Sequence, residues 1–166
     1  MRGNVMAKKI NKTNAMRALD KLKLNYECTE YDAGDGKIDG VSVAEKIGKL
    51  KDEVFKTLVT KSASGNYYIF VVPVDHELNL KKCAKACGEK SVEMIAVKDI
   101  TKVTGYIRGG CSPLAMKKQY PTFLHKSAVD LPSVTFSGGK IGTQISMNPD
   151  DLLTACGGVY ADLTDE

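Results

Sequence analysis

Residues 53–74, EVFKTLVTKSASGNYYIFVVPV, contain two runs of strand-forming residues separated by a turn. Both runs, residues 53–61 and 66–74, are rich in β-branched and aromatic side chains, which fit the pleated surface of a sheet. Between them, SASGN supplies the small and polar residues of a tight connection. The pattern predicts an antiparallel hairpin at the centre of a β-sheet.

Upstream of the hairpin, the chain predicts a helix followed by a strand. Apolar residues recur at helical spacing within residues 12–24, and Thr13 or Asn14 can cap the first turn. Residues 25–31 alternate in polarity and include aromatic and branched side chains, as a half-buried strand requires. An acidic loop that contains several glycines follows this strand.

Capping residues mark further helices on either side of the hairpin. Ser42 and Glu45 have the spacing of a capping box, so we expect a short helix that starts at Ser42. Asn79 can cap a helix that ends at Gly88. Another helical turn is expected near residues 96–103, ahead of the next glycine.

The last third of the chain predicts short strands and a final helix. The strands are expected at residues 121–125, 132–140 and 143–147. Asn148 as N-cap, Pro149 at the first position and Gly157 after the last turn mark the helix. Since helices and strands mix without a regular βαβ alternation, we predict an α+β fold: a single domain with a curved mixed β-sheet flanked by helices.

Composition restricts the class of protein. The 166 residues carry a net charge of +4, with 43% hydrophobic and 27% charged residues, as in an ordinary globular domain. No run approaches the roughly 20 apolar residues of a membrane span, and the basic N-terminus lacks the apolar stretch of a signal peptide. We expect a cytoplasmic protein without membrane contact. Residues 1–12 are expected to be an N-terminal extension, with Met6 as an alternative start to Met1, and residues 163–166 an acidic tail.

The five cysteines form no recognisable framework. Their odd number, in a chain without an export signal, predicts reduced thiols. Cys83 and Cys87 stand four residues apart on a predicted helix, but no second ligand pair accompanies them and His76 and His125 are isolated. Cys111 has no identifiable histidine partner, so it is interpreted as a packing residue. We therefore predict neither a metal nor a cofactor.

Residues 105–118, GYIRGGCSPLAMKK, form the segment best suited to binding an anion or a carbonyl oxygen. Gly109 and Gly110 let main-chain N–H groups approach a ligand closely, although a structural turn also explains the pair. Ser112 can cap a helix that starts at Pro113, whose positive end would face the loop. The motif as a whole favours a binding loop.

Three lysines have both a structural and a functional interpretation. Lys117 and Lys118 would follow within the helix predicted after the glycine pair, either as a solvated face or in contact with phosphates. Lys56 lies in the first strand of the hairpin, where alternation places it on the face of Val54 and Leu58. It is either an edge lysine that reaches solvent or a cleft lysine that stabilises an anion.

Four separated segments carry a family resemblance. They are EVFKTLV (53–59), LNLKKCAKACGEKSVEM (78–94), TGYIRGGCSPLAMKK (104–118) and VTFSGGKIG (134–142). In order and spacing they resemble the YbaK/EbsC family of aminoacyl-tRNA deacylases, which is related to the editing domain of bacterial prolyl-tRNA synthetases. The resemblance implies one domain, residues 13–162, whose curved sheet forms a pseudo-barrel.

The resemblance also implies which residues form the site. Lys56 takes the position of the family's key lysine. The other substrate-binding positions that it implies are Tyr31, Thr57, Gly109, Gly110, Ser112, Pro113 and Ser137. Ala115 departs from the family pattern, because many relatives carry glycine there; alanine is strained if the position needs a positive φ.

The activity implied by the resemblance is trans-editing. Such an enzyme would clear cysteine from tRNA(Pro), with Cys-tRNA(Cys) as a further substrate and prolyl-tRNA synthetase as a candidate partner; Lys117 and Lys118 are the candidates for the tRNA backbone. The substrate's own thiol would attack its ester and form a cyclic thiolactone, so the protein supplies positioning and charge stabilisation. Two alternatives stay open: a hydrolytic deacylase for another small amino acid, such as alanine on tRNA(Pro), and a non-catalytic tRNA- or synthetase-binding module.

Overall fold

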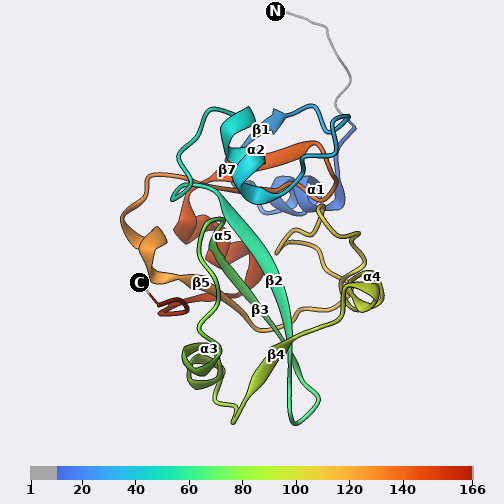
Figure 1. The fold of residues 1–166 in the computed structure, drawn as a ribbon. Helices are drawn as coiled ribbons and strands as arrows, with labels where there is room; N and C mark the ends of the chain where they lie inside the picture. Colours follow the sequence, from blue (N-terminus) through green and yellow to red (C-terminus); the bar gives the residue numbers. More distant parts are fainter. Residues whose placement is uncertain (1–10, 166) are drawn as a thin grey trace, which may run out of the picture.

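The computed structural model describes residues 11–165 as two β-sheets enclosed by helices (Figure 1). One sheet has the order β4-β2-β3-β5-β8, formed by Val92–Met94, Phe55–Ser62, Tyr67–Pro73, Thr122–His125 and Val159–Ala161 in that order. The other has the order β1-β7-β6, formed by Glu27–Glu30, Thr143–Met147 and Val134–Ser137. Of the expected N-terminal extension at residues 1–12, residues 1–10 lie outside the described part of the chain.

The predicted hairpin is the centre of the larger sheet. β2 and β3 pair antiparallel, from Phe55 opposite Pro73 to Lys61 opposite Tyr67. β5 pairs with β3 in parallel and β8 with β5 in parallel, so the sheet is mixed, as expected. The sequence does not predict the edge strands β4 and β8. Each has only three residues and is recognised as a strand by its pairing with the adjacent strand of the sheet.

The two sheets meet where β2 begins. Val54 and Thr135 form an isolated parallel bridge, and the Thr135 N–H donates a hydrogen bond of 2.9 Å to the Glu53 carbonyl oxygen. The junction links β6 of the smaller sheet to β2 of the larger one. The predicted curved mixed arrangement is therefore confirmed, built from two sheets joined at one edge.

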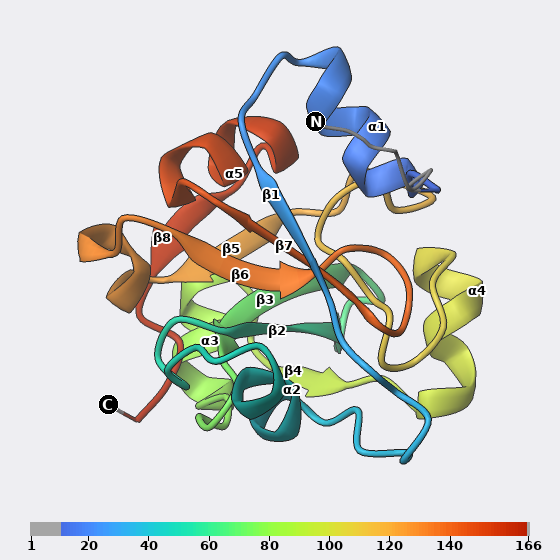
Figure 2. The ribbon, with the colours of Figure 1, turned by 90° about the horizontal axis from the view of Figure 1, so that it is seen from above.

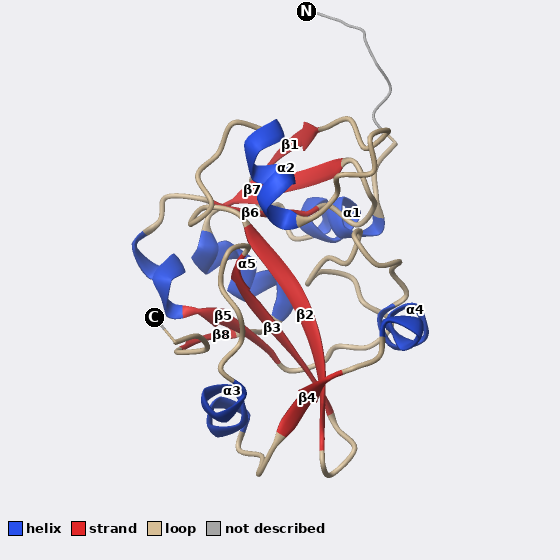
Figure 3. Cartoon of the chain, viewed as in Figure 1, coloured by secondary structure: helices blue, strands red, loops and turns tan. Residues whose placement is uncertain are grey.

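Helices lie on both sides of the sheets (Figure 2), and Figure 3 distinguishes them from the strands. The α-helices are α1 (Asn14–Lys21), α2 (Gly40–Lys46), α3 (Leu80–Cys87), α4 (Ile100–Thr104) and α5 (Pro149–Cys156). Two 3-10 helices, η1 (Val97–Asp99) and η2 (Lys126–Asp130), complete the set among residues 11–165. None of these helices is long and apolar enough to cross a membrane.

Capping side chains set the helix starts. The Thr13, Asn79 and Asn148 side chains accept from N–H groups in the first turns of α1, α3 and α5, as predicted. The predicted start of α2 is wrong: Asp39 is the N-cap, and its side chain accepts from the Ser42 N–H at 3.1 Å. Ser42 therefore lies inside the first turn, because a cap former three residues earlier already satisfies its N–H.

The apolar interior is divided by the larger sheet. α1 and α5 cover one face with Met16 and Leu152, and α3 covers the other with Cys83. Leu163 is fully buried in the α3 cluster and Thr164 is 1% exposed, so ordered packing continues into the segment expected to be an acidic tail. Burying an apolar side chain such as Met16, Leu152 or Leu163 contributes about 1.5–3 kcal/mol to the free energy of unfolding.

Candidate active site at the junction of the two sheets

The glycine loop packs directly against the loop that joins β6 to β7. Gly109 has φ +86°, and a Cβ there would lie 2.8 Å from Ile38 Cδ1. A Cβ at Gly110 would lie 3.0 Å from the Cα of Lys140. Gly109 has a left-handed φ that favours glycine, and a Cβ at Gly110 would be tight against the Lys140 backbone, so the absence of side chains lets the two loops pack closely.

The two glycine N–H groups differ. The Gly110 N–H donates to the Ile107 carbonyl oxygen at 3.0 Å and so closes the turn. The Gly109 N–H donates none of the backbone hydrogen bonds found in the turns and loops of residues 11–165. Of the pair predicted to contact substrate, Gly109 is therefore the one whose donor remains available.

The segment after the glycine pair corrects one prediction. Residues 113–118 form bends and not the helix expected to start at Pro113. Ala115 has a left-handed φ of +59°, so the backbone leaves the right-handed helical region at this residue. Ser112 is fully buried, and its Oγ accepts from the Leu114 N–H at 3.3 Å, which favours its structural interpretation; Pro113 is also buried.

Lys117 and Lys118 are both exposed beside the glycine loop. The Lys117 ammonium donates to the Lys102 carbonyl oxygen at 3.1 Å, which ties this segment to α4. The Lys117 stem also lies 3.2 Å from where a Cβ at Gly105 would be. Arg108 and Lys140, on the two loops that pack together, are exposed as well, so the mouth of the loop is basic.

The β6–β7 loop gathers two more predicted site residues. The Tyr31 N–H, just beyond β1, donates to the Gly142 carbonyl oxygen at 3.0 Å. The Ser137 Oγ accepts from the Gly139 N–H at 3.2 Å. The Tyr31 backbone, Ser137 and the glycine loop thus meet around residues 137–142.

An isolated bridge joins the strand of Lys56 to the strand of Ser137. Val54 and Thr135 form a parallel bridge, so each strand advances two residues in the same direction, to Lys56 on β2 and Ser137 on β6. Residues two apart on a strand share a face. Lys56 therefore shares a face of β2 with Val54, which packs against α2, and Ser137 shares a face of β6 with Thr135.

Lys56 is a half-buried lysine with a weak partner. Its side chain is 25% exposed, and its ammonium lies 3.7 Å from a carboxylate oxygen of Glu77, which is 92% exposed. An exposed carboxylate at this distance contributes little to stability, so the ammonium is available to a bound anion. The cleft interpretation of Lys56 is thus compatible with its position.

Thr57 points the other way. It lies opposite Val71, which belongs to the α1–α5 core, whereas Lys56 lies opposite Val72 in the α3 cluster. The Thr57 hydroxyl is buried and has no hydrogen-bond partner among residues 11–165. Leaving a buried hydroxyl unpaired costs roughly 1–3 kcal/mol. The structure does not bring the Thr57 side chain to the face of Lys56.

The cysteine near the loop is poorly suited to nucleophilic attack. Burial raises the pKa of Cys111 to about 11, so its thiol is protonated at neutral pH. The other side chains that touch the β6–β7 loop, Thr13 and Tyr106, were not predicted as site residues. Thr13 carries only a helix-cap signal in the sequence, and Tyr106 only its place in the glycine motif.

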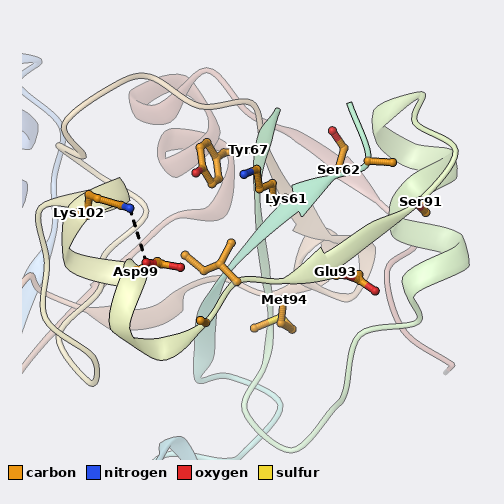
Figure 4. A pocket seen from close by; sticks show the side chains of 11 residues that line it. Lys61, Ser62, Tyr67, Ser91, Glu93, Met94, Asp99 and Lys102 are labelled. Carbon is orange, nitrogen blue, oxygen red and sulfur yellow. Dashed lines mark ion pairs between the residues drawn. The ribbon is translucent and has the colours of Figure 1, made fainter. Parts of the chain in front are cut away.

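A groove of about 520 Å³ lies at the other end of the hairpin (Figure 4). It is lined by residues of β2, β3, β4, η1 and α4, including Lys61, Tyr67, Met94, Asp99 and Lys102. Lys102 and Asp99 form an ion pair of 3.7 Å within it, so its charges are mixed. None of the predicted site residues lines this groove.

The fold defines a single-domain α+β protein whose two sheets are joined where β2 begins. The chain belongs to the family described as the aminoacyl-tRNA editing domain, whose profile matches residues 39–155. It is 44% identical over 161 residues to an Enterococcus faecalis protein named "Putative Cys-tRNA(Pro)/Cys-tRNA(Cys) deacylase EbsC", covering 96% of this chain and 98% of the relative.

Two solved structures share the fold. One, described as "a putative trans-editing enzyme for prolyl tRNA synthetase", has a TM-score of 0.78 and 24% identity and covers 90% of this chain and 94% of its own. The other, described as a hypothetical protein, has a TM-score of 0.84 and 22% identity and covers 92% of this chain and 100% of its own. At these identities the likeness concerns the fold alone.

Proposed function

We propose that the protein is a trans-editing deacylase that removes cysteine from tRNA(Pro), with Cys-tRNA(Cys) as a further substrate. The observation that carries the proposal is the half-buried, weakly paired Lys56 on β2, two residues beyond the bridge that joins β2 to β6, whose following loop packs against Gly110. The family of editing domains and the name of the 44% identical relative support the same substrate class. The cytoplasm, where aminoacyl-tRNA is used, is the compartment that suits this activity.

The reaction needs no nucleophile from the protein. The substrate's thiol sulfur attacks its own ester carbonyl carbon, a C–S bond forms, and the C–O bond to the terminal ribose breaks. The thiol proton ends on the ribose oxygen, so the products are uncharged tRNA and a four-membered thiolactone. Holding the two reacting groups together can supply up to about 7–11 kcal/mol of the barrier reduction in such intramolecular steps.

The protein would supply charge and position. We assign to the Lys56 ammonium the stabilisation of negative charge that develops on the ester, and to the Gly109 N–H a hydrogen bond to the carbonyl or ribose oxygen. Ser137 and Tyr31 would line the same side of the site. Thr57 and the buried Ser112 and Pro113 would act by shaping the strand and the loop around the substrate.

The tRNA body would lie over the basic mouth of the glycine loop. Lys117 and Lys118 are exposed there, with Arg108 and Lys140 nearby on the neighbouring loops. Contacts of lysine and arginine with phosphates weaken with added salt, because binding releases counterions from the nucleic acid. We include prolyl-tRNA synthetase as the partner that would present the mischarged tRNA.

A deacylation panel tests the proposal. Cysteine, alanine, serine and proline esters on tRNA(Pro) and tRNA(Cys) are incubated with the protein, its Lys56→Ala variant and its Lys61→Ala variant. Lys61 is the matched control, since it lies on the same strand but lines the distant groove. We expect cleavage of cysteine esters and a loss of roughly a hundredfold in Lys56→Ala alone.

Three other results would change the conclusion. Cleavage of alanine esters would indicate a hydrolytic deacylase that activates water. Binding of charged tRNA without any cleavage would indicate a non-catalytic module. Near-normal activity of Lys56→Ala would remove this lysine from the mechanism.

A further inference from the structure

The β6–β7 loop is held from one side by Thr13, the N-cap residue of α1. The Thr13 hydroxyl donates to the Gly138 carbonyl oxygen at 2.5 Å while its oxygen accepts from the Met16 N–H at 3.2 Å. A hydroxyl has one proton to donate, so the two bonds together fix its orientation. Because Met16 is 1% exposed in the core, the helix that carries this hydroxyl is itself firmly anchored.

Tyr106 holds the same loop from the other side. A Cβ at Gly139 would lie 3.2 Å from Tyr106 Cε1 and 3.3 Å from the Cβ of Thr13, so this glycine lies between the two side chains. The Tyr106 hydroxyl donates to the Leu114 carbonyl oxygen of the glycine loop. Burial raises the pKa of Tyr106 to about 12, so the hydroxyl keeps its proton at neutral pH.

These contacts join the two loops that carry the proposed substrate contacts. The Gly139 N–H bonds to Ser137 Oγ, and Gly110 packs against the backbone of Lys140. Any shift of the β6–β7 loop therefore moves Ser137 relative to the glycine loop. Loops are otherwise the most mobile parts of a fold, so a site built on two of them needs supports from rigid elements.

We propose that Thr13 and Tyr106 form a clamp that sets the distance between Ser137 and the glycine loop, and that both are positioning residues for the deacylation. The inference rests on the proposed function of this site. Neither side chain need touch the substrate, because each acts through the backbone of a loop that does. Misplacing a reacting group by about 1 Å can cost a hundredfold in rate, so a small displacement of either loop is enough to slow the reaction.

Three substitutions and two controls test the clamp. Thr13→Val removes both hydrogen bonds at nearly constant shape, Thr13→Ser restores the hydroxyl, and Tyr106→Phe removes only the bond to Leu114. Tyr120→Phe is the matched tyrosine control, since its hydroxyl donates to the Val103 carbonyl oxygen at 2.7 Å, away from both site loops. Asn148→Ala is the matched cap control on α5.

The readout separates position from stability. At saturating Cys-tRNA(Pro), we expect the rate to fall about tenfold or more in Thr13→Val and Tyr106→Phe, with affinity for uncharged tRNA(Pro) within about twofold. Thr13→Ser should recover most of the rate, and both controls should keep it. Equal losses in Asn148→Ala, or full activity in Thr13→Val, would overturn the clamp.

A second measurement does not depend on the reaction. Hydrogen exchange of the Gly138 and Gly139 amides should become faster in Thr13→Val and Tyr106→Phe but not in Tyr120→Phe. If the parent protein leaves Cys-tRNA(Pro) intact, the proposed function fails while exchange still decides whether the clamp exists. Unchanged exchange in both variants would refute it.

Discussion

Replacing Ala115 by glycine should make the protein more stable. Ala115 is exposed and has φ +59°, a left-handed conformation. An L-residue there costs about 1–2 kcal/mol. Glycine avoids this strain but gives the unfolded chain more freedom, which costs about 0.4–1 kcal/mol. The net gain in the free energy of unfolding is therefore about 0–1.6 kcal/mol, with a middle value of about 0.8 kcal/mol, which corresponds to about 2–3 °C in Tm for a chain of this length.

Two further glycine substitutions make this prediction specific. Lys23 has φ +59° and is also exposed, so Lys23→Gly should stabilise the protein in the same way. Ala96 is exposed but has φ −65°, so Ala96→Gly should destabilise it by roughly 0.4–1 kcal/mol. Urea unfolding of the three variants beside the parent gives the comparison. A loss of stability in Ala115→Gly equal to that in Ala96→Gly would refute the strain.

Two more predictions concern titration and thiol chemistry. The buried His125 ring accepts from the Leu163 N–H, and burial lowers the pKa of His125. The folded state thus binds this proton less well than the unfolded one, so the urea midpoint should fall as pH drops below about 6.5, and His125→Gln should flatten that slope. The charged or titratable neighbours of the ring are Asp162, His76, Lys126 and Lys82. Cys28 is exposed whereas Cys83 and Cys156 are buried, so a thiol reagent should label Cys28 first in the native protein. The Cys28→Ser substitution should abolish the fast phase of labelling. Labelling of a buried thiol at the same rate as Cys28 would contradict this.

Local chemistry explains what the sequence predicts well. The β2–β3 hairpin follows from alternation and a turn within one continuous stretch, and the caps Asn79 and Asn148 act on N–H groups three residues away. The start of α2 is missed because Asp39 and Ser42 are both good cap formers, and only the three-dimensional structure selects between them. The helix expected at Pro113 is absent and Ala115 is left-handed there, although Ser-Pro is a normal helix start and alanine is a good helix former.

Less of the candidate site than of the fold can be predicted from the sequence. The glycine pair is visible in the sequence, as is its requirement for residues without a side chain. The strands of Lys56 and Ser137 are joined by the bridge between Val54 and Thr135, which are some eighty positions apart, and no local pattern encodes such a pairing. Likewise, the sequence does not show that the buried Thr57 hydroxyl lacks a hydrogen-bond partner among residues 11–165, because this depends on which face of β2 the side chain occupies. The resemblance to a family identified Lys56 and Ser137 as site residues. The structure shows that the strands carrying them are joined through Val54 and Thr135.

The role of the substrate's thiol is tested most directly by a single-turnover comparison of Cys-tRNA(Pro) with Ala-tRNA(Pro) in heavy-oxygen water, with the released product identified by mass spectrometry. We predict that the cysteine ester is cleaved with formation of the thiolactone, that the alanine ester persists, and that Lys56→Ala slows the first reaction about a hundredfold. Cleavage of both esters at similar rates, with solvent oxygen in the released alanine, would contradict a thiol-assisted mechanism.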